Sequence, residues 1–317
     1  WVKKDLDQYQ IVEREPVKGN YRGITITSAA LPSSGGIVLI EALNILSAYE
    51  LEKLDGVSRI HIVSEAMRRA YHDRALYLGD SDFVDVPVKK LINQKYAAKL
   101  RASIKRDKIT PSDSLTGNMD QKIEGKDTTH FSIIDKQGNR VAATLSINFP
   151  FGSGFVAEGT GVLLNDEMDD FVSKSGSMNG YGLVGGVANS IEPAKRMLSS
   201  MTPTFLEDET RLAILGTPGG SRIISMVLLA ILDFAEGKEP SSWVWLPRYH
   251  HQYIPDLIQY EKGGLTQEEV EGLSKLGHQL KETPYRYGNM QAIQYNKLSK
   301  KISAESDPRG EGQALIR

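Results

Sequence analysis

Apolar and polar residues alternate in two neighbouring stretches near the middle of the chain. The apolar members are Phe131, Ile133, Ile134, Val141, Ala143, Leu145 and Ile147. With the glycine-containing turn at 137–138 between them, the two stretches predict a β-hairpin. A two-residue turn places Ser146 opposite Thr129 and next to Thr128. Period-two alternation then puts Ser146 and Asn148 on the face away from the apolar residues. Hydroxyl and amide groups are therefore expected where the first strand begins.

Other stretches have the apolar spacing of helices, and short β-rich runs lie between them. The expected helices span residues 39–49, 57–78, 91–104, 223–234 and 267–276, and the expected strands span 23–28, 204–207, 211–215, 278–281 and 291–295. This alternation indicates a mixed α/β or α+β protein.

The helix over 57–78 has the clearest amphipathic pattern. Its apolar stripe consists of Ile60, Val63, Met67, Ala70 and Tyr71. The charged residues expected on its solvated face are Arg68, Arg69, Asp73 and Arg74. His61 and His72 are expected to be ordinary surface histidines of this helix.

Residues 105–126 are polar and charged and have no apolar period, which predicts an exposed linker. Exposed polar segments are where chains are cut and where few contacts cross a boundary. This segment ends just before Asp127 and Thr128. A cut between these two residues would divide the chain into 1–127 and 128–317.

Composition narrows the functional classes. The chain has 317 residues, of which 40% are hydrophobic, enough for one large domain or two modest ones. Lysine and arginine number 38 against 40 acidic residues. The net charge of the chain therefore gives no reason to expect binding to nucleic acid or to an anionic membrane. The longest apolar run, 223–232, is shorter than the roughly 20 residues of a membrane span. The absence of cysteine excludes disulfides and thiolate nucleophiles.

No motif for a metal or an organic cofactor is recognisable. His250 and His251 are adjacent, without metalloprotease spacing, and the acidic run 165–170 lacks the ligand pattern of an EF-hand. Residues 180–185 match the dinucleotide-binding pattern by letter. However, no strand precedes them and no helix follows them. We therefore expect neither a metal nor a cofactor.

The start of the hairpin is a candidate site for nucleophilic catalysis. A threonine hydroxyl is a poor nucleophile unless a base lies beside it, and a chain-terminal threonine can use its own α-amine. Cutting before Thr128 would free such an amine, with a pKa of roughly 7.7–8.0. Taken alone, however, a Thr-Thr-His stretch is more often simply β-strand sequence.

A second candidate feature is the glycine pair that precedes the helix over 223–234. Gly219 and Gly220 have no side chains to obstruct their amides, which at a helix N-terminus can face a developing oxyanion. A tight strand-to-helix turn explains the same residues equally well.

Five motifs in order along the chain resemble those of the γ-glutamyltransferase (γ-glutamyltranspeptidase) family. They are Asp127-Thr-Thr-His130, Asn165 to Phe171, Leu198-Ser-Ser-Met-Thr-Pro203, Gly216 to Arg222 and Pro247-Arg-Tyr-His-His251. The resemblance covers essentially the whole chain.

The resemblance implies a four-layer αββα sandwich of the N-terminal-nucleophile hydrolase type. The protein would be a zymogen that cuts itself between Asp127 and Thr128. Thr128 would then form an acyl-enzyme with a γ-glutamyl donor such as glutathione, resolved by water or by an amino acid or peptide.

The resemblance also assigns roles to individual residues. Ser146, at a position that is usually threonine, would orient the nucleophile, and Gly219 and Gly220 would supply oxyanion amides. The residues holding the donor's α-amino and α-carboxylate groups would be Asn148, Glu167, Asp170, Ser199 and Ser200. Residues 173–190, with Tyr181, would form a lid that excludes water.

Residues 1–127 resemble the C-terminal part of the family's large subunit, and 128–317 resemble its small catalytic subunit, together forming one αββα domain. The chain begins at Trp1 rather than at methionine. About half of a usual large subunit is expected to be missing, including an arginine that pairs with the donor carboxylate. The resemblance implies a periplasmic or secreted protein.

Three alternatives remain open at this point. Within the same fold, the protein could be a poly-γ-glutamate depolymerase or a glutaryl-type (cephalosporin) acylase. In a different class, it could be an unprocessed paralogue that binds ligands without catalysis.

Overall fold

The computed structural model describes residues 2–115 and 128–317, and its centre is a six-stranded antiparallel sheet. In spatial order the strands are β1 (Val17–Tyr21), β2 (Ile24–Ser28), β7 (Thr204–Glu207), β8 (Arg211–Gly216), β12 (Gln291–Asn296) and β13 (Ile302–Ser306). The sequence predicted β2, β7, β8 and β12. It missed β1, which contains glycine and asparagine, and β13, which has one large apolar residue. Since β2 pairs with β7, segments from both sides of Thr128 share this sheet.

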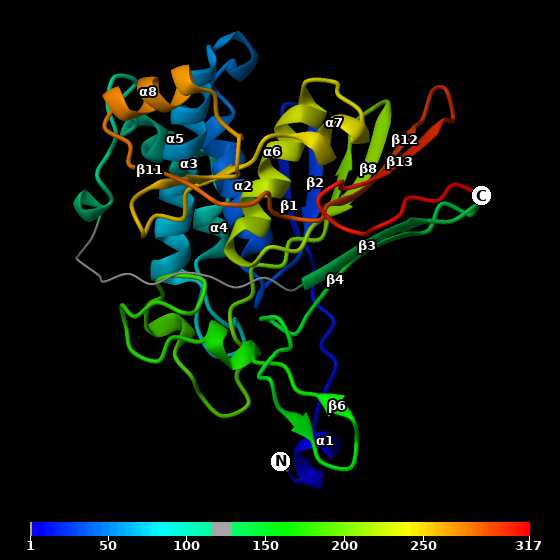
Figure 1. The fold of residues 1–317 in the computed structure, drawn as a ribbon. Helices are drawn as coiled ribbons and strands as arrows, with labels where there is room; N and C mark the ends of the chain where they lie inside the picture. The colour runs from blue at the N-terminus through cyan, green and yellow to red at the C-terminus, as the bar shows by residue number, and fades with distance from the viewer. Residues whose placement is uncertain (1, 116–127) are drawn as a thin grey trace.

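Two helices cover one face of the sheet, and a third packs against the first of them (Figure 1). The covering helices are α2 (Gly35–Leu46) and α6 (Ile223–Ala235), and the outer one is α3 (Gly56–Tyr77). Every residue of α2 is buried, as expected for a helix that is apolar nearly all round. The remaining helices are α1 (Lys3–Asp7), α4 (Val88–Leu91), α5 (Gln94–Ala102), α7 (Pro240–Trp245) and α8 (Gln267–Lys275).

The start of the helix predicted over 91–104 is wrong, although most of the prediction is confirmed as α5. Helix α4 ends at Leu91, and α5 begins at Gln94 after Asn93. The Asn93 side chain accepts a hydrogen bond from the backbone N–H of Lys95 at 2.8 Å. This N-cap satisfies a free amide of α5 and therefore starts a new helix.

The predicted solvated face of α3 is also wrong. Its charged residues Arg68, Arg69, Asp73 and Arg74 are all buried. Glu65 pairs with Arg68 at 2.9 Å and with Arg69 at 2.6 Å, so two buried guanidiniums share one carboxylate. His61 is fully buried, with Nδ1 2.8 Å from Nε2 of His278. The loop around Asp256 covers Arg68, and helix α8 also packs on α3. Groups of α5 and its C-terminal cap cover Arg69 and Asp73.

Part of the predicted exposed linker packs against this same side. Ser112 is fully buried, and its hydroxyl donates to the Tyr253 carbonyl at 2.7 Å. The Ile109 amide donates to the Leu276 carbonyl at 3.0 Å. Residues 116–126 and Asp127 lie outside the described residues.

The predicted hairpin is confirmed as β3 (Thr128–Ile134) and β4 (Arg140–Ser146), but its turn is longer than two residues. The Asp135 carboxylate accepts hydrogen bonds from the amides of Gln137 and Asn139, which builds a turn over residues 135–139. The register shifts by one residue as a result. Thr128, not Thr129, lies directly opposite Ser146.

The hairpin packs on the face of the six-stranded sheet away from α2 and α6, and its inner face is polar. The buried ring of His130 bonds to Thr144 Oγ1 at 2.7 Å and to Ser132 Oγ at 3.1 Å. A Cβ at Gly216 of β8 would lie 2.3 Å from this ring, so the close approach requires glycine there. Burial lowers the pKa of His130 to about 4, which keeps its imidazole neutral.

The outer face of the hairpin is apolar. Its residues Phe131, Ile133, Val141, Leu145 and Ile147 are each 37–53% exposed. No other described residues cover this surface. The described residues therefore supply three layers, namely helices, the six-stranded sheet and the hairpin, in a mixed α+β arrangement of the class predicted.

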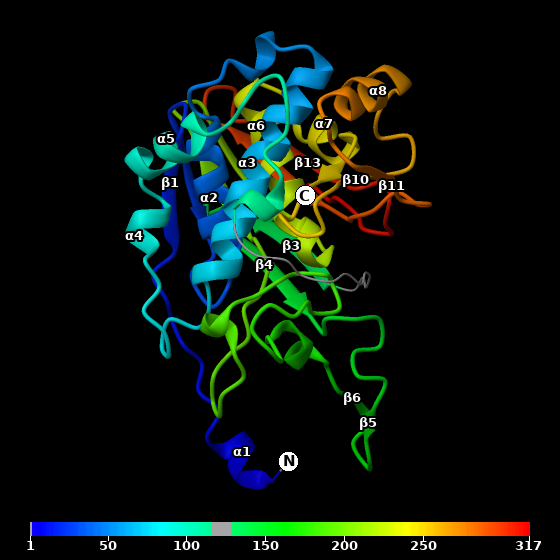
Figure 2. The same ribbon diagram turned by 90° about the vertical axis from the view of Figure 1, so that its left-hand side faces the viewer.

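The remaining strands are short and form two separate small sheets, β11-β10-β9 and β5-β6 (Figure 2). They are β5 (Val156–Ala157), β6 (Val162–Leu163), β9 (Tyr249–His250), β10 (Ile258–Tyr260) and β11 (Leu280–Glu282). Within residues 2–115 and 128–317, no helix is both long and apolar enough to span a bilayer.

Candidate active site

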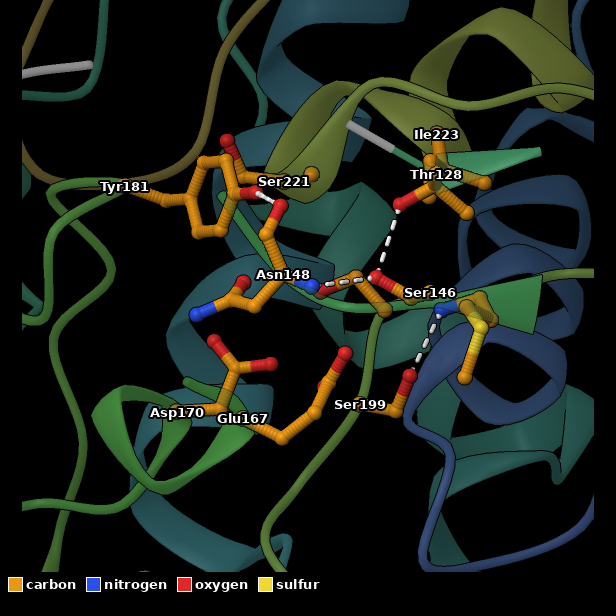
Figure 3. Close-up of a pocket in the computed structure, with 12 residues that line it drawn as sticks. Thr128, Ser146, Asn148, Glu167, Asp170, Tyr181, Ser199, Ser221 and Ile223 are labelled. Atoms are coloured by element: carbon orange, nitrogen blue, oxygen red, sulfur yellow. Dashed lines mark hydrogen bonds between the residues drawn. The ribbon is translucent and has the colours of Figure 1, made fainter. Parts of the chain in front are cut away.

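Thr128 begins β3, and its Oγ1 lies 3.1 Å from the hydroxyl oxygen of Ser146 (Figure 3). Ser146 Oγ also accepts a hydrogen bond from the Asn148 amide at 2.9 Å. Thr129 is exposed and pairs with Leu145 on the outer face of the hairpin. Strand alternation thus turns Thr128, and not Thr129, toward the cluster of polar groups.

Two carboxylates lie on the same side of Thr128, on the 3-10 segment Glu167–Asp170. Oε1 of Glu167 is buried and has no hydrogen-bond partner among the described residues. Burial raises the pKa of Glu167, and it raises that of Asp170 to about 7 although Arg74 acts in the opposite direction. Two acids that lack a full counter-charge make this end of the site suited to a cation.

Arg74 is a charged residue behind the site that the sequence analysis missed. It is buried on α3, and its guanidinium donates to Ser34 Oγ at 3.0 Å and to Ser200 Oγ at 3.3 Å. A signal for its burial was present, because Arg74 follows Met67 by seven residues and Ala70 by four. Both of these residues belong to the apolar stripe, so helical geometry places Arg74 on the same face.

Ser199 and Ser200 are anchored to the start of α2. The Ser199 carbonyl accepts hydrogen bonds from Ser34, at 2.8 Å from its amide and 2.7 Å from its hydroxyl. Ser199 Oγ in turn accepts from the Met201 amide at 3.0 Å. Hydrogen bonds from the backbone and the side chain of the turn at 33–36 thus position Ser199 and Ser200.

Gly219 and Gly220 lie between β8 and α6, with φ angles of +142° and +56°. These are left-handed conformations that favour glycine. A Cβ at Gly220 would lie 2.2 Å from a ring atom of Tyr181. Glycine is therefore required at this turn, and its use as an oxyanion hole stays a prediction.

The loop over 173–190 covers the site through Tyr181. The Tyr181 hydroxyl donates to the Asn148 carbonyl at 2.7 Å, and its ring stacks on Phe149 with centroids 4.8 Å apart. Tyr181 is 9% exposed. In this structure, the loop closes one wall of the cavity.

A single cavity brings together the predicted site residues described by the structure, except Gly219. Its lining residues are Thr128, Ser146, Asn148, Glu167, Asp170, Tyr181, Ser199, Ser200, Met201, Gly220, Ser221 and Ile223. Gly219 lines a neighbouring cavity that also reaches Thr128. Across the two described ranges, no three His, Asp or Glu side chains are grouped to hold a metal ion.

Together, the α+β fold and the strand-initial threonine define a protein of the N-terminal-nucleophile hydrolase class. The family model described as gamma-glutamyltranspeptidase matches residues 1–316. The chain belongs to the γ-glutamyltranspeptidase family.

The relatives show how much of such a protein this chain represents. It is 45% identical over 280 residues to the glutathione hydrolase proenzyme of a Pseudomonas species (strain A14), covering 87% of this chain and 48% of that protein. It is 33% identical to an Acylase ACY 1 proenzyme of a Pseudomonas species (strain V22), covering 92% and 50%. The chain thus spans about half the length of these relatives.

A solved structure supports the same assignment. It is the γ-glutamyltranspeptidase from Pseudomonas nitroreducens complexed with L-DON, 43% identical to this chain with a TM-score of 0.56. The match covers 60% of this chain and 99% of the solved chain.

Proposed function

We propose that the protein is a γ-glutamyltransferase and glutathione hydrolase, with Thr128 as its nucleophile. One observation carries the proposal. A cavity has the Thr128–Ser146 hydroxyl pair at one end and the incompletely paired acids Glu167 and Asp170 at the other. A γ-glutamyl group has a carbonyl and an α-amino cation at its two ends, so it complements such a cavity. The 45% identical relative is a glutathione hydrolase proenzyme, which supports the same donor.

The reaction begins once the bond between Asp127 and Thr128 is cut. The freed Thr128 amine takes the proton of its own hydroxyl, and Oγ1 bonds to the γ-carbonyl carbon of the donor. Amides of Gly219 and Gly220 stabilise the oxyanion. The carbon–nitrogen bond then breaks, and the leaving amine takes up the proton. Water or an acceptor amine attacks the resulting ester and restores Thr128.

In this proposal, the rest of the cavity orients the donor. Glu167 and Asp170 pair with its α-amino group. Ser199, Ser200 and Asn148 hydrogen-bond to the remaining polar groups, and Arg74 holds Ser200 in place from behind. Ser146 fixes the Thr128 hydroxyl at 3.1 Å.

The division into a large-subunit part, 1–127, and a catalytic part, 128–317, belongs to the same proposal, as does an extracytoplasmic location. The proposal includes a further large-subunit segment that contributes an arginine to the donor carboxylate.

Two alternatives within the fold differ in their donors. The acylase alternative draws on the 33% identical relative, but a glutaryl donor has no amine to occupy the acidic end. A poly-γ-glutamate donor has to extend past the loop over 173–190, which covers the cavity through Tyr181. Both observations favour a small γ-glutamyl donor.

The direct test combines mass spectrometry with a hydrolysis assay. Purified protein is expected to yield a fragment whose N-terminal residue is Thr128, and this form should release the anilide from γ-glutamyl nitroanilide. Glutathione should compete, whereas long poly-γ-glutamate should compete poorly. An intact chain that binds γ-glutamyl compounds without turnover would instead support the non-enzymatic alternative.

The acidic end of the cavity predicts a pH dependence. The pKa of Asp170 is raised to about 7, so below this pH the empty site holds a protonated Asp170 that pairs poorly with an amine. The ratio of kcat/KM for a γ-glutamyl anilide to that for a glutaryl anilide should therefore fall as pH drops below about 7. The decline should approach roughly tenfold per pH unit.

The ratio cancels the titration of the Thr128 amine, which affects both donors equally. In Asp170→Asn, whose side chain does not titrate, this ratio should no longer fall as the pH drops below about 7. A ratio that stays constant from pH 5.5 to 8 in the unaltered protein would show that Asp170 does not recognise the amine.

A further inference from the structure

A cavity remote from Thr128 lies among the helices. This remote cavity has a volume of about 340 Å³, and its walls come from α3, α6, β9, α8 and the loop that precedes α8. Helix α6 connects it with the active site, because Ile223 at its start lines the active-site cavity, whereas Leu229 and Asp233 line the remote one. At 1.5 Å per residue, Ile223 and Asp233 lie about 15 Å apart along the helix. No described residue lines both cavities.

Much of the wall of the remote cavity is apolar. Ile60 of α3, Leu229 of α6 and Tyr249 of β9 are all buried, and Leu246 and Leu265 add to the apolar surface. Cavities of roughly 300–1,000 Å³ with mainly apolar walls and a few polar groups are the usual form of small-molecule sites. The remote cavity therefore has the size and the surface to hold one small organic molecule.

Asp233 is a buried acid in this apolar wall. The residue is 6% exposed, and Oδ2 of its carboxylate has no hydrogen-bond partner among the described residues. Burial raises the pKa of Asp233, although the Ser242 hydroxyl acts in the opposite direction. A buried acceptor without a donor destabilises the folded state. A ligand that brings an N–H donor to Asp233 would remove this cost.

The other charges around the remote cavity leave it negative. Arg59 pairs with Glu236 at 2.6 Å, which balances its charge. Glu269 is a second carboxylate in the wall, and one of its oxygens accepts a backbone hydrogen bond at 2.8 Å in the capping box of α8. In the part of the chain that the structure describes, neither Asp233 nor Glu269 forms an ion pair, and Arg59 and Lys238 attract Asp233 only from a longer distance. Asp233 also lies in the last turn of α6, where the helix dipole is negative. This cavity therefore favours a cation.

We propose that the remote cavity binds a small organic amine, with the ammonium group at Asp233 and an apolar body against Ile60, Leu229 and Tyr249. The ammonium group supplies both the donor and the positive charge that Asp233 lacks. The apolar wall removes the rest of the ligand from water. A neutral analogue would bring no charge to Asp233, and an anion would meet two carboxylates that have no ion pair. This site goes beyond the proposed γ-glutamyl transfer and does not depend on it.

The test uses 2-phenylethylamine as the probe, with 2-phenylethanol and 3-phenylpropanoate as its neutral and anionic analogues. In calorimetric titration of the purified protein at neutral pH, the amine should bind at least about tenfold more tightly than the alcohol, and the anion should show no binding. Asp233→Asn should weaken binding of the amine about 10- to 100-fold, the range for one charge-assisted hydrogen bond at a buried site, and change that of the alcohol by less than about twofold. This variant should melt at the same temperature as the unaltered protein or higher, because it no longer buries an unpaired carboxylate.

Asp170→Asn is the matched control, because it makes the same change to an acid of the active-site cavity. This variant should leave the affinity for 2-phenylethylamine within about twofold of the unaltered protein. Equal binding of the amine and the alcohol, or loss of amine binding in Asp170→Asn but not in Asp233→Asn, would overturn the proposed site. A lower melting temperature or failure to fold in Asp233→Asn would also overturn it, since the carboxylate would then serve the fold. These results are distinct from those of the anilide assay, which tests γ-glutamyl transfer.

Discussion

Thr128→Ala is expected to abolish both the chain cut and the turnover of γ-glutamyl anilide. In the proposed mechanism the same hydroxyl acts as nucleophile in both reactions, and no other described side chain lies in its place beside Ser146. The loss of turnover should reach roughly 10⁴-fold or more. Intact-mass measurement reports the cut, and anilide release reports the turnover.

Thr128→Ser is the matched variant, because it keeps the hydroxyl and removes one methyl group. It should retain part of both activities. Thr129→Ala should be cut and should turn over the anilide about as well as the unaltered protein, since Thr129 is exposed on the outer face of the hairpin. Normal processing in Thr128→Ala together with a loss in Thr129→Ala would mean that the nucleophile has been misassigned.

Asp170→Ala is expected to lower kcat/KM for a γ-glutamyl anilide by roughly 30- to 4,000-fold. Removing one member of a buried charge pair typically costs about 2–5 kcal/mol, and about 1.4 kcal/mol corresponds to tenfold. A glutaryl anilide has no amine to lose its partner, so its kcat/KM should change far less. Steady-state kinetics with both anilides measures the difference.

The control must separate recognition from folding, because Asp170 also lies near the buried Arg74. Asp170→Asn keeps the shape of the side chain. Like Asp170→Ala, it should lower kcat/KM for the γ-glutamyl anilide far more than for the glutaryl anilide, but with less effect on the thermal melting point. Asp82→Ala removes a carboxylate from a surface pair with Arg14 and should leave both anilides unchanged. Equal slowing of both donors in Asp170→Ala would move the acylase alternative ahead.

Much of the fold followed from local patterns, and the errors have physical causes. Strand alternation predicted the hairpin correctly, but the side chain of Asp135 created a longer turn and shifted the register by one residue. The charged residues of α3 suggested a solvent-exposed face. However, the Glu65 carboxylate pairs with both Arg68 and Arg69, which allows both guanidiniums to be buried. Such pairing is decided by tertiary contacts, which no periodicity reveals.

The residues of the candidate site, unlike the elements of the fold, were predicted from a family resemblance rather than from local patterns. Resemblance selected residues from separate motifs, and the structure brings all of them except Gly219 to one cavity, although the roles of the individual residues stay predictions. Arg74 could have been found from its place on the apolar stripe. The neighbouring cavity lined by Gly219 could not, because its lining residues lie far apart in the chain and converge only through folding.

In the proposed cut form of the protein, the pairing of β2 with β7 joins two separate polypeptides. Ile26 faces Leu206 and Thr27 faces Phe205, so the sheet is continuous across the two pieces. Before the cut, unfolding is a unimolecular event. Afterwards it releases two separate polypeptides, and refolding requires them to meet in solution. The melting temperature of the processed form then depends on protein concentration, and dilution favours the unfolded state.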